Sequence, residues 1–63
     1  MKNNIKKYRK KYKLTQEELA KVVGVTRQTI IAIENDKYNP TLELAMNLAK
    51  YLDVSVEELF ILE

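Results

Sequence analysis

An all-α fold of five short helices is predicted for this 63-residue chain, and three observations predict it. Apolar residues recur at spacings of three and four, which is the periodicity of amphipathic helices. The chain holds only one glycine and one proline, Gly24 and Pro40, so few positions break a helix. Four periodic segments follow a Ser or Thr that suits a helix N-cap: Thr15, Thr26, Thr41 and Ser55.

Length and composition predict one small domain, residues 1–63, and exclude several functions. Such a chain buries only about 60% of its unfolded surface. It contains no Cys and no His, which excludes disulfides, thiolate metal sites, the usual zinc ligand and the usual general base. Paired carboxylates and phosphate-loop spacings are also missing, so we expect no enzyme, no metal and no cofactor. No membrane span or signal peptide is visible, and we expect a soluble cytoplasmic protein.

The net charge of +2 conceals a strong asymmetry along the chain. Residues 1–13 hold seven of the eleven basic residues and no acidic ones, whereas the other fifty residues hold four basic and nine acidic residues. A basic end suits a polyanion such as nucleic acid. A solvated lysine-rich helix explains the same pattern equally well.

The first helix is predicted to begin at a cap on Asn3 or Asn4 and to end at about Tyr12. Its apolar stripe follows the spacing i, i+3, i+7 and consists of Ile5, Tyr8 and Tyr12. A basic residue, Arg9, lies four residues after Ile5 and therefore points at least half inward.

An ion pair between Arg9 and Glu34 is predicted from the positions of these two charges. Glu34 follows Ile30 and Ile33 on the core edge of the third helix, so it also points inward. A buried charge without a partner is very costly and is normally paired. We therefore expect Arg9 and Glu34 to pair in a structural role that joins the first helix to the third.

Residues 15–35 predict two helices joined by a tight turn. Thr15 caps the first of them, and Glu18 three residues later completes a capping box. Its apolar face is expected to consist of Leu19, Val22 and Val23. Gly24 ends it in a left-handed conformation. Thr26 caps the next helix, and helices joined by so short a turn must cross steeply, which is the arrangement of a helix-turn-helix motif.

The C-terminal half is predicted to add a loop and two helices. Residues 36–40 form the loop, because Pro40 disfavours helix at the residue before it. The fourth helix begins after Thr41 and ends at about Leu52, with Leu44 and Tyr51 partly off its core side. That core side consists of Ala45, Leu48, Ala49 and Leu52. Ser55 and Glu58 form a second capping box before a short helix whose Leu59 and Phe60 reach the core.

The segment T-Q-E-E-L-A-K-V-V-G-V-T-R-Q-T-I-I-A-I-E-N closely resembles the lambda-repressor-like helix-turn-helix family, the Cro and xenobiotic-response-element (Xre) class of regulators. The match continues through D-K-Y-N-P-T and V-S-V-E-E-L-F, and it extends from Ile5 without a gap. This resemblance implies a compact five-helix DNA-binding domain. It also implies an arginine–glutamate pair at positions 9 and 34.

The third helix is the candidate reader of DNA bases, since the N-terminal part of this helix enters the major groove in helix-turn-helix proteins. Arg27 can pair with guanine and Gln28 with adenine, and the resemblance implies base contacts at these positions. Ile31, one turn later, either contacts a thymine methyl group or folds back onto neighbouring helices.

Contacts to the DNA backbone are expected from a second set of residues. Gln16 lies at the first turn of the second helix, where free N–H groups favour an anion, and its family counterpart contacts the backbone. Residues that flank the reading helix are the other candidates, although Thr26 is also a cap and Tyr38 can pack over the loop: Thr26, Asn35, Lys37 and Tyr38. From the first helix, Lys10 and Lys13 are expected to come closest to DNA.

A homodimer is expected because one reading helix contacts only a few base pairs. The favoured dimer surface is C-terminal, with Leu44 or Tyr51 nearby: Val54, Val56, Phe60, Ile61 and Leu62. Residues 1–3 can also lie beside residues 61–63 as short strands. The alternative is that Phe60 and Leu62 only close the core of a monomer.

The sequence therefore predicts a DNA-binding transcriptional regulator, most simply a repressor that binds a palindromic operator as a homodimer. We expect double-stranded DNA as its partner, no small-molecule ligand, and a location at the nucleoid. Two alternatives stay open at this point. One is an antitoxin-type regulator with a protein partner, and the other is a protein-interaction module that uses the fold as a scaffold.

Overall fold

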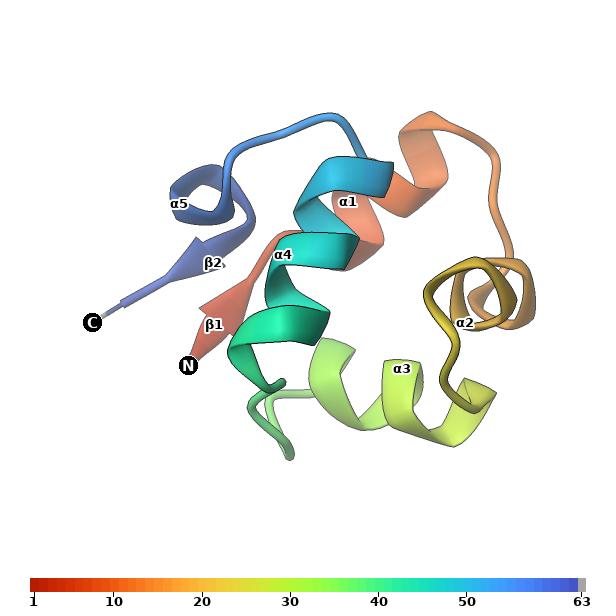
Figure 1. The fold of residues 1–63 in the computed structure, drawn as a ribbon, viewed down its shortest axis with the longest axis horizontal. Helices are drawn as coiled ribbons and strands as arrows, with labels where there is room; N and C mark the ends of the chain where they lie inside the picture. Colours follow the sequence, from red (N-terminus) through yellow and green to blue (C-terminus); the bar gives the residue numbers. More distant parts are fainter. Residues whose placement is uncertain (63) are drawn as a thin grey trace.

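The computed structural model describes residues 1–62, which fold into five helices and a two-stranded sheet (Figure 1). The elements follow one another as β1 (Lys2–Asn3), α1 (Ile5–Lys11), α2 (Gln16–Val23), α3 (Arg27–Glu34), α4 (Leu42–Tyr51), α5 (Val56–Leu59) and β2 (Phe60–Ile61). The prediction of an all-α, five-helix fold with short terminal strands is confirmed. In the described part of the chain, no helix has the length and apolar character that a membrane crossing requires.

Four helices begin at the caps that the sequence predicts. The hydroxyls of Thr15, Thr26, Thr41 and Ser55 each accept a hydrogen bond from the backbone N–H three residues later. Both predicted capping boxes are present, and they are formed by Thr15 with Glu18 and by Ser55 with Glu58. Caps of this kind depend on neighbours in the chain, so they form as the local sequence dictates.

Four helices also end in the same way, with a residue in the left-handed region. Gly24 has φ 76°, as its position predicts, but Lys13, Asp36 and Asp53 have φ of 57°, 59° and 58° without being glycine. After α3, for example, the Asp36 N–H donates to the Ile33 carbonyl at 3.0 Å, and the Lys37 N–H donates to the Ala32 carbonyl at 2.8 Å. This pair of bonds is the Schellman motif, which satisfies carbonyls that the helix leaves free.

The core lies where all five helices meet. Its largest fully buried side chains include at least one from each helix or its cap: Ile5, Leu19, Ile30, Ile33, Leu48, Leu52 and Leu59. Partly buried side chains, among them Tyr8, Val23 and Val25, pack around this cluster. Burial of α3 through Ile30 and Ile33 therefore leaves the opposite side of that helix outside the core.

Three expectations about the core were wrong. Tyr12 is 43% exposed because α1 ends at Lys11, so Tyr12 no longer lies on the helical stripe. Val22 is 50% exposed, while Ala20 is buried, because the buried face of α2 centres on Leu19, Ala20 and Val23, roughly a third of a turn from Val22. Leu44 is buried, since it lies four residues before Leu48 on the core face of α4.

The two termini meet in an antiparallel pair. Lys2 is paired with Ile61 and Asn3 with Phe60, and the Asn4 N–H donates to the Leu59 carbonyl at 2.8 Å. The expected strands were residues 1–3 and 61–63, so the pairing is shifted by one residue, and Glu63 lies outside the described residues. This sheet joins the start of α1 to the end of α5 within one copy of the chain.

Candidate nucleic-acid interface

The first turn of helix α3 is exposed to solvent, and hydrogen bonds of Thr26 hold the N-terminus of the helix in place. The Thr26 hydroxyl accepts the Thr29 N–H at 3.3 Å and lies 3.1 Å from the Thr29 hydroxyl. Arg27 and Gln28 follow directly and are exposed. In Figure 1, α2 is seen nearly end-on while α3 runs across the view, so the two helices cross steeply as predicted. The two side chains expected to read bases therefore project from the start of a helix that the core holds.

Ile31 and Ala32 occupy an intermediate position on the same helix. Both are half-buried, in contrast to Arg27 and Gln28. Part of the Ile31 side chain therefore packs against the protein, and part remains open to a thymine methyl group. The two interpretations of Ile31 from the sequence do not exclude each other.

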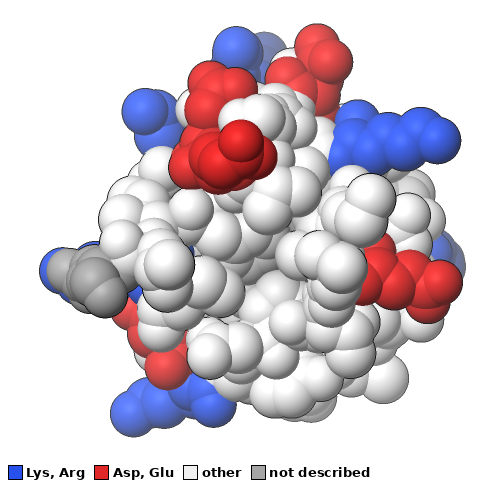
Figure 2. All heavy atoms as spheres, turned by 60° about the vertical axis from the view of Figure 1, so that its left-hand side comes forward, with Lys and Arg blue, Asp and Glu red and all other residues white. Residues whose placement is uncertain are grey.

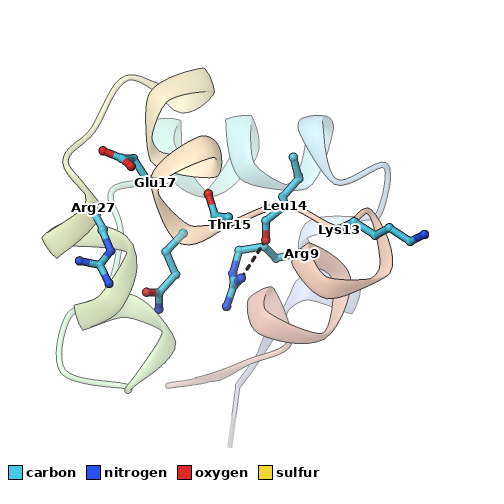
Figure 3. Close-up of a pocket in the computed structure, with 7 residues that line it drawn as sticks. Arg9, Lys13, Leu14, Thr15, Glu17 and Arg27 are labelled. Atoms are coloured by element: carbon cyan, nitrogen blue, oxygen red, sulfur yellow. Dashed lines mark hydrogen bonds between the residues drawn. The ribbon is translucent and has the colours of Figure 1, made fainter.

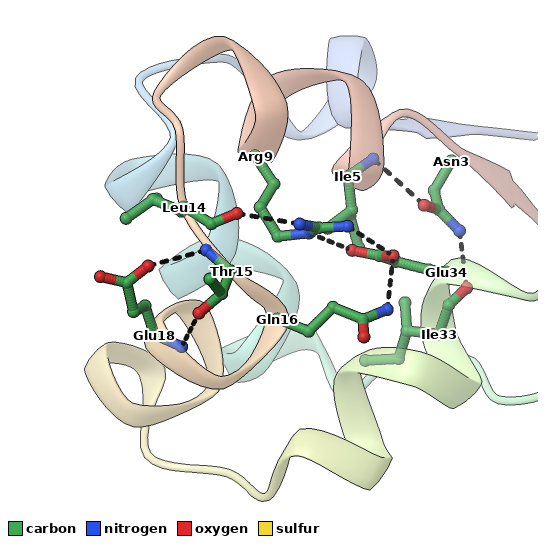
Figure 4. A network of polar contacts seen from close by, with 9 residues as sticks. All are labelled: Asn3, Ile5, Arg9, Leu14, Thr15, Gln16, Glu18, Ile33 and Glu34. Carbon is green, nitrogen blue, oxygen red and sulfur yellow. Dashed lines mark hydrogen bonds and ion pairs between the residues drawn. The ribbon is translucent and has the colours of Figure 1, made fainter.

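Arg9 and Glu34 form the ion pair that the sequence predicts (Figure 4). Arg9 Nε and Nη2 donate to the two carboxylate oxygens of Glu34 at 2.8 and 3.2 Å. Arg9 Nη1 donates to the Leu14 carbonyl at 2.8 Å. The guanidinium thus joins α1, the loop before α2, and the last turn of α3.

Gln16 belongs to the same network. Its Nε2 donates to Glu34 Oε1 at 3.1 Å, so the buried carboxylate holds the amide in one orientation. An amide nitrogen carries two hydrogens, and its oxygen can accept two bonds, so Gln16 retains capacity for a phosphate or a base. Sequence reasoning anticipated Gln16 as a backbone contact but not its attachment to Glu34, because that bond joins residues eighteen positions apart.

An open recess of ≈ 580 Å³ lies between the N-termini of α2 and α3 (Figure 3). Three of its lining residues are cationic and one is acidic: Arg9, Lys13, Leu14, Thr15, Gln16, Glu17 and Arg27. The capping box uses the N–H groups of Thr15 and Glu18, at 2.8 and 3.0 Å. The N–H groups of Gln16 and Glu17 are therefore the ones that can face an anion in this recess.

The other expected backbone contacts lie at the edges of α3 and on α1. Asn35, Lys37 and Tyr38 are exposed at and just beyond the end of α3. Lys10 is exposed in the last turn of α1, whereas Lys13 lines the recess together with Gln16 and Arg27. Gln16, Lys13 and Arg27 thus line one recess, in which the Lys13 side chain extends away from Arg27 (Figure 3), and they are separate from the group at the other end of α3.

The fold perturbs the ionisation of Glu18, in the first turn of α2. The backbone N–H of Thr15, followed by its side chain, holds the pKa of the Glu18 carboxyl below the ordinary value of 4.5. Both hydrogen bonds favour the charged form, and a negative charge at a helix N-terminus is itself favourable. The capping box is therefore strongest when Glu18 is ionised.

The residues expected at a dimer surface differ widely in exposure. Phe60 is 8% exposed, and Val54 and Val56 are half-buried against the core, so these three mainly stabilise their own chain. Ile61 and Leu62 are 41% and 89% exposed. Leu44, expected near this surface, is in the core, whereas Tyr51 is 46% exposed. Phe60 therefore closes the core of its own chain, which was the alternative to a place in the dimer surface.

The face that carries α5, β1 and β2 has few charges at its centre (Figure 2). Lysine, arginine, aspartate and glutamate side chains gather around its edge, and uncharged atoms fill the middle. Ile61 of β2 is an exposed large apolar side chain, and exposed apolar surface on small proteins commonly marks interaction sites where it is extensive. No three His, Cys, Asp or Glu side chains among residues 1–62 are grouped so that they could hold a metal ion.

Comparison with known proteins also identifies a helix-turn-helix domain in this chain. A helix-turn-helix family model matches residues 5–59. An uncharacterized HTH-type transcriptional regulator of Methanocaldococcus jannaschii is 57% identical over 63 residues, which cover all of this chain and 96% of that protein.

Two solved structures are similar over most of their length. The restriction-modification controller protein C.AhdI from Aeromonas hydrophila has a TM-score of 0.82 and 32% identity, and the match covers 90% of this chain and 86% of that chain. The P22 c2 repressor protein, solved in complex with a synthetic operator, has a TM-score of 0.83 and 35% identity, with coverage of 86% and 82%.

Proposed function

The chain belongs to the helix-turn-helix family of DNA-binding transcriptional regulators, and we propose that it binds a palindromic operator as a homodimer with α3 in the major groove. The family and the relatives reported above are regulators and not enzymes. They do not favour an antitoxin or a scaffold over a regulator of transcription. A repressor is the simplest form of such a protein, because bound protein blocks access to the DNA beneath it.

The proposal is supported most by the contrast between the two sides of α3. Ile30 and Ile33 are 0% and 1% exposed, so the core fixes the helix in place. Arg27 and Gln28 in its first turn are exposed and can reach base edges. Bidentate pairs of arginine with guanine and of glutamine with adenine each contribute about 1–3 kcal/mol of discrimination. Ile31 adds an apolar contact for a thymine methyl group.

Backbone contacts at both ends of α3 position it on the duplex. The recess with Gln16 and Arg27 takes a phosphate on one side, where Lys13 is part of the lining. The exposed Lys10 in the last turn of α1 adds positive charge. Thr26 borders the same side through its hydroxyl. Residues after the helix grip the backbone on the other side: Asn35, Lys37 and Tyr38. Contacts of this kind set orientation and carry little sequence information.

The homodimer is supported by exposed apolar side chains and by size. Ile61 and Leu62 are exposed, Val54 and Val56 are half-buried, and Phe60 holds β2 to the core. The chain measures 28 × 21 × 19 Å. Two copies joined at these exposed residues can therefore place their α3 helices about 34 Å apart, one turn of DNA.

Selection of bound duplexes from a random pool tests the proposal directly. We expect enrichment of an inverted repeat with half-sites about 10 base pairs apart, and binding that weakens steeply as salt rises. The mass of the protein alone, by light scattering at micromolar concentration, should be that of a dimer. Enrichment of a single half-site with a monomer mass would contradict the homodimer, and no enrichment at all would contradict base reading.

A further inference from the structure

Asn3 connects three parts of the fold, two through its side chain (Figure 4) and one through its backbone. Its Nδ2 donates to the Ile33 carbonyl at 2.8 Å, in the last turn of α3. Its Oδ1 accepts the Ile5 N–H at 3.1 Å, at the start of α1. Its backbone is paired with Phe60 in the terminal sheet. One amide therefore satisfies a helix end and a helix start at the same time.

The contact with α3 also extends into the segment that follows this helix. Asn3 Nδ2 lies 3.2 Å from Asp36 Oδ1, to which it donates its second hydrogen. The Ile33 carbonyl accepts both the Asn3 amide and the Asp36 N–H, the latter at 3.0 Å, so its two lone pairs are used. Asp36 has φ 59° and is followed directly by Lys37 and Tyr38. Asn3 thus holds both the end of α3 and the start of the segment expected to grip phosphate.

On its other side, Asn3 is connected to the proposed dimer surface. β1 contains only Lys2 and Asn3, and its partner strand leads from Phe60 through Ile61 to the exposed Leu62. A shift of β2 on dimer formation would therefore reach Asn3 through the backbone pairing. The hydrogen bonds of Asn3 would then transmit it to α3.

We propose that Asn3 is a positioning residue that sets the place of α3 and of residues 35–38 relative to the terminal sheet, and so links base reading to dimer geometry. This inference rests on the proposed function. Base contacts require hydrogen-bond geometry within a few tenths of an ångström, whereas attraction between lysines and phosphates acts over many ångströms. Loosening α3 should therefore reduce specific binding far more than non-specific binding.

The variant Asn3→Asp separates the two functions of the amide. An aspartate keeps an oxygen for the Ile5 N–H, and its charge suits the N-terminus of α1. It cannot donate to the Ile33 carbonyl, and it places a carboxylate against Asp36. The hydrogen bond from the Ile5 N–H is preserved, while the attachment of α3 is lost.

Asn4→Asp is the matched control. Asn4 Nδ2 donates to the Glu58 carbonyl at 3.1 Å, so the same exchange one residue later affects α5 and leaves α3 untouched. Both variants change the net charge equally. We expect Asn3→Asp to lower affinity for the selected operator about tenfold more than Asn4→Asp does, with affinities for random DNA within about twofold of each other. Asn3→Asp should also broaden the preferred spacing between half-sites.

Two further measurements keep the outcomes distinct. Hydrogen exchange at the Asp36 and Lys37 amides, measured without DNA, should be faster in Asn3→Asp than in Asn4→Asp. These amides donate to the Ile33 and Ala32 carbonyls at the end of α3, and loss of the Asn3 contact should open those bonds more often. Adding Asp36→Asn to Asn3→Asp supplies a donor for the new carboxylate and should restore part of the lost specificity.

Equal operator affinities for Asn3→Asp and Asn4→Asp would overturn the positioning role while leaving the proposed function intact. A wild-type protein that enriches no sequence would overturn the link to base reading together with the proposed function. Exchange rates would then decide separately whether Asn3 holds the end of α3.

Discussion

Arg9 on α1 and Glu34 at the end of α3 form a bidentate ion pair, with N–O distances of 2.8 and 3.2 Å and side chains only 10% and 4% exposed. Because the pair is buried, the fold tolerates both charges together but not one charge alone. Each charge satisfies the other, but either one alone would remain in a site that water hardly reaches. Because Gln16 is attached to the same carboxylate, the pair connects the stability of the fold to the expected DNA surface.

Removing one partner should be very costly. We expect Glu34→Ala to lower the free energy of unfolding by about 3–5 kcal/mol, because Arg9 is left buried and unpaired. Replacing both residues together, as in Arg9→Met with Glu34→Leu, should recover much of that loss. Urea denaturation of these two variants and of the wild type measures both effects. A denaturation midpoint for Glu34→Ala equal to that of the wild type would contradict this account.

Base readers and phosphate contacts should respond differently to truncation. Arg27→Ala should cost about 1–3 kcal/mol on the selected operator and relax preference at one position of each half-site. Lys37→Ala should weaken binding to all sequences alike and lower the salt slope by about 1. Titrations of operator and random duplexes at several salt concentrations measure both. A uniform loss for Arg27→Ala would assign it to the backbone instead.

The left-handed residues at helix ends offer a test that separates stability from binding. Asp53 and Lys13 have φ of 58° and 57°, which cost free energy for any residue except glycine. We expect Asp53→Gly and Lys13→Gly each to raise the free energy of unfolding by about 0.5–1 kcal/mol. Lys13→Gly should also weaken DNA binding, since it removes a cation from the recess, whereas Asp53→Gly should not. Equal DNA affinities of the two variants would exclude Lys13 as a contact.

Stability in acid should depend on Glu18. Its carboxyl has a lowered pKa in the folded state, so its contribution is fully present above the ordinary value of 4.5 and is lost as the pH falls through the folded-state value. Glu18→Gln keeps an amide oxygen for the Thr15 N–H but does not titrate. The variant should therefore lose less stability than the wild type when the pH is lowered below 4.5. Melting curves across this range test it, and parallel losses would contradict it.

Core closure and dimer formation can be separated at the C-terminus. Phe60, 8% exposed, belongs to the core, and we expect Phe60→Ala to cost about 3–5 kcal/mol of stability. Leu62 is 89% exposed, so Leu62→Glu should change monomer stability by no more than about 0.5 kcal/mol while preventing association. Light scattering and denaturation of both variants distinguish the effects. A dimer that survives Leu62→Glu would place the interface elsewhere.

Local chemistry explains why much of the fold was predictable. The caps at Thr15, Thr26, Thr41 and Ser55 and the turn at Gly24 each depend on residues within a few positions. Arg9 and Glu34 were predictable from a different rule: two inward charges of opposite sign require partners. The resemblance to a known family pointed to the same pair. Which residues contact DNA is a prediction that the experiments above address.

Other features depended on how the helices pack. Periodicity placed Tyr12 and Val22 on buried faces, but α1 ends at Lys11 and the buried face of α2 lies at Leu19 and Ala20, so both residues are exposed. Leu44 is buried because α4 turns that edge toward the core. Periodicity identifies a face only when a helix is long and its neighbours are known, and α1 and α2 have seven and eight residues.

The number of helices, their starts, the helix-turn-helix and the need for an inward ion pair could all be predicted from the sequence, because they follow from short-range hydrogen bonds and from the cost of burying charge. Three features emerge only from the packing of the helices: Asn3 holds the end of α3, Gln16 is attached to Glu34, and Phe60 belongs to the core while Leu62 does not. The two hydrogen bonds join residues thirty and eighteen positions apart. Their partners are chosen by the packing of whole helices, which no local pattern encodes.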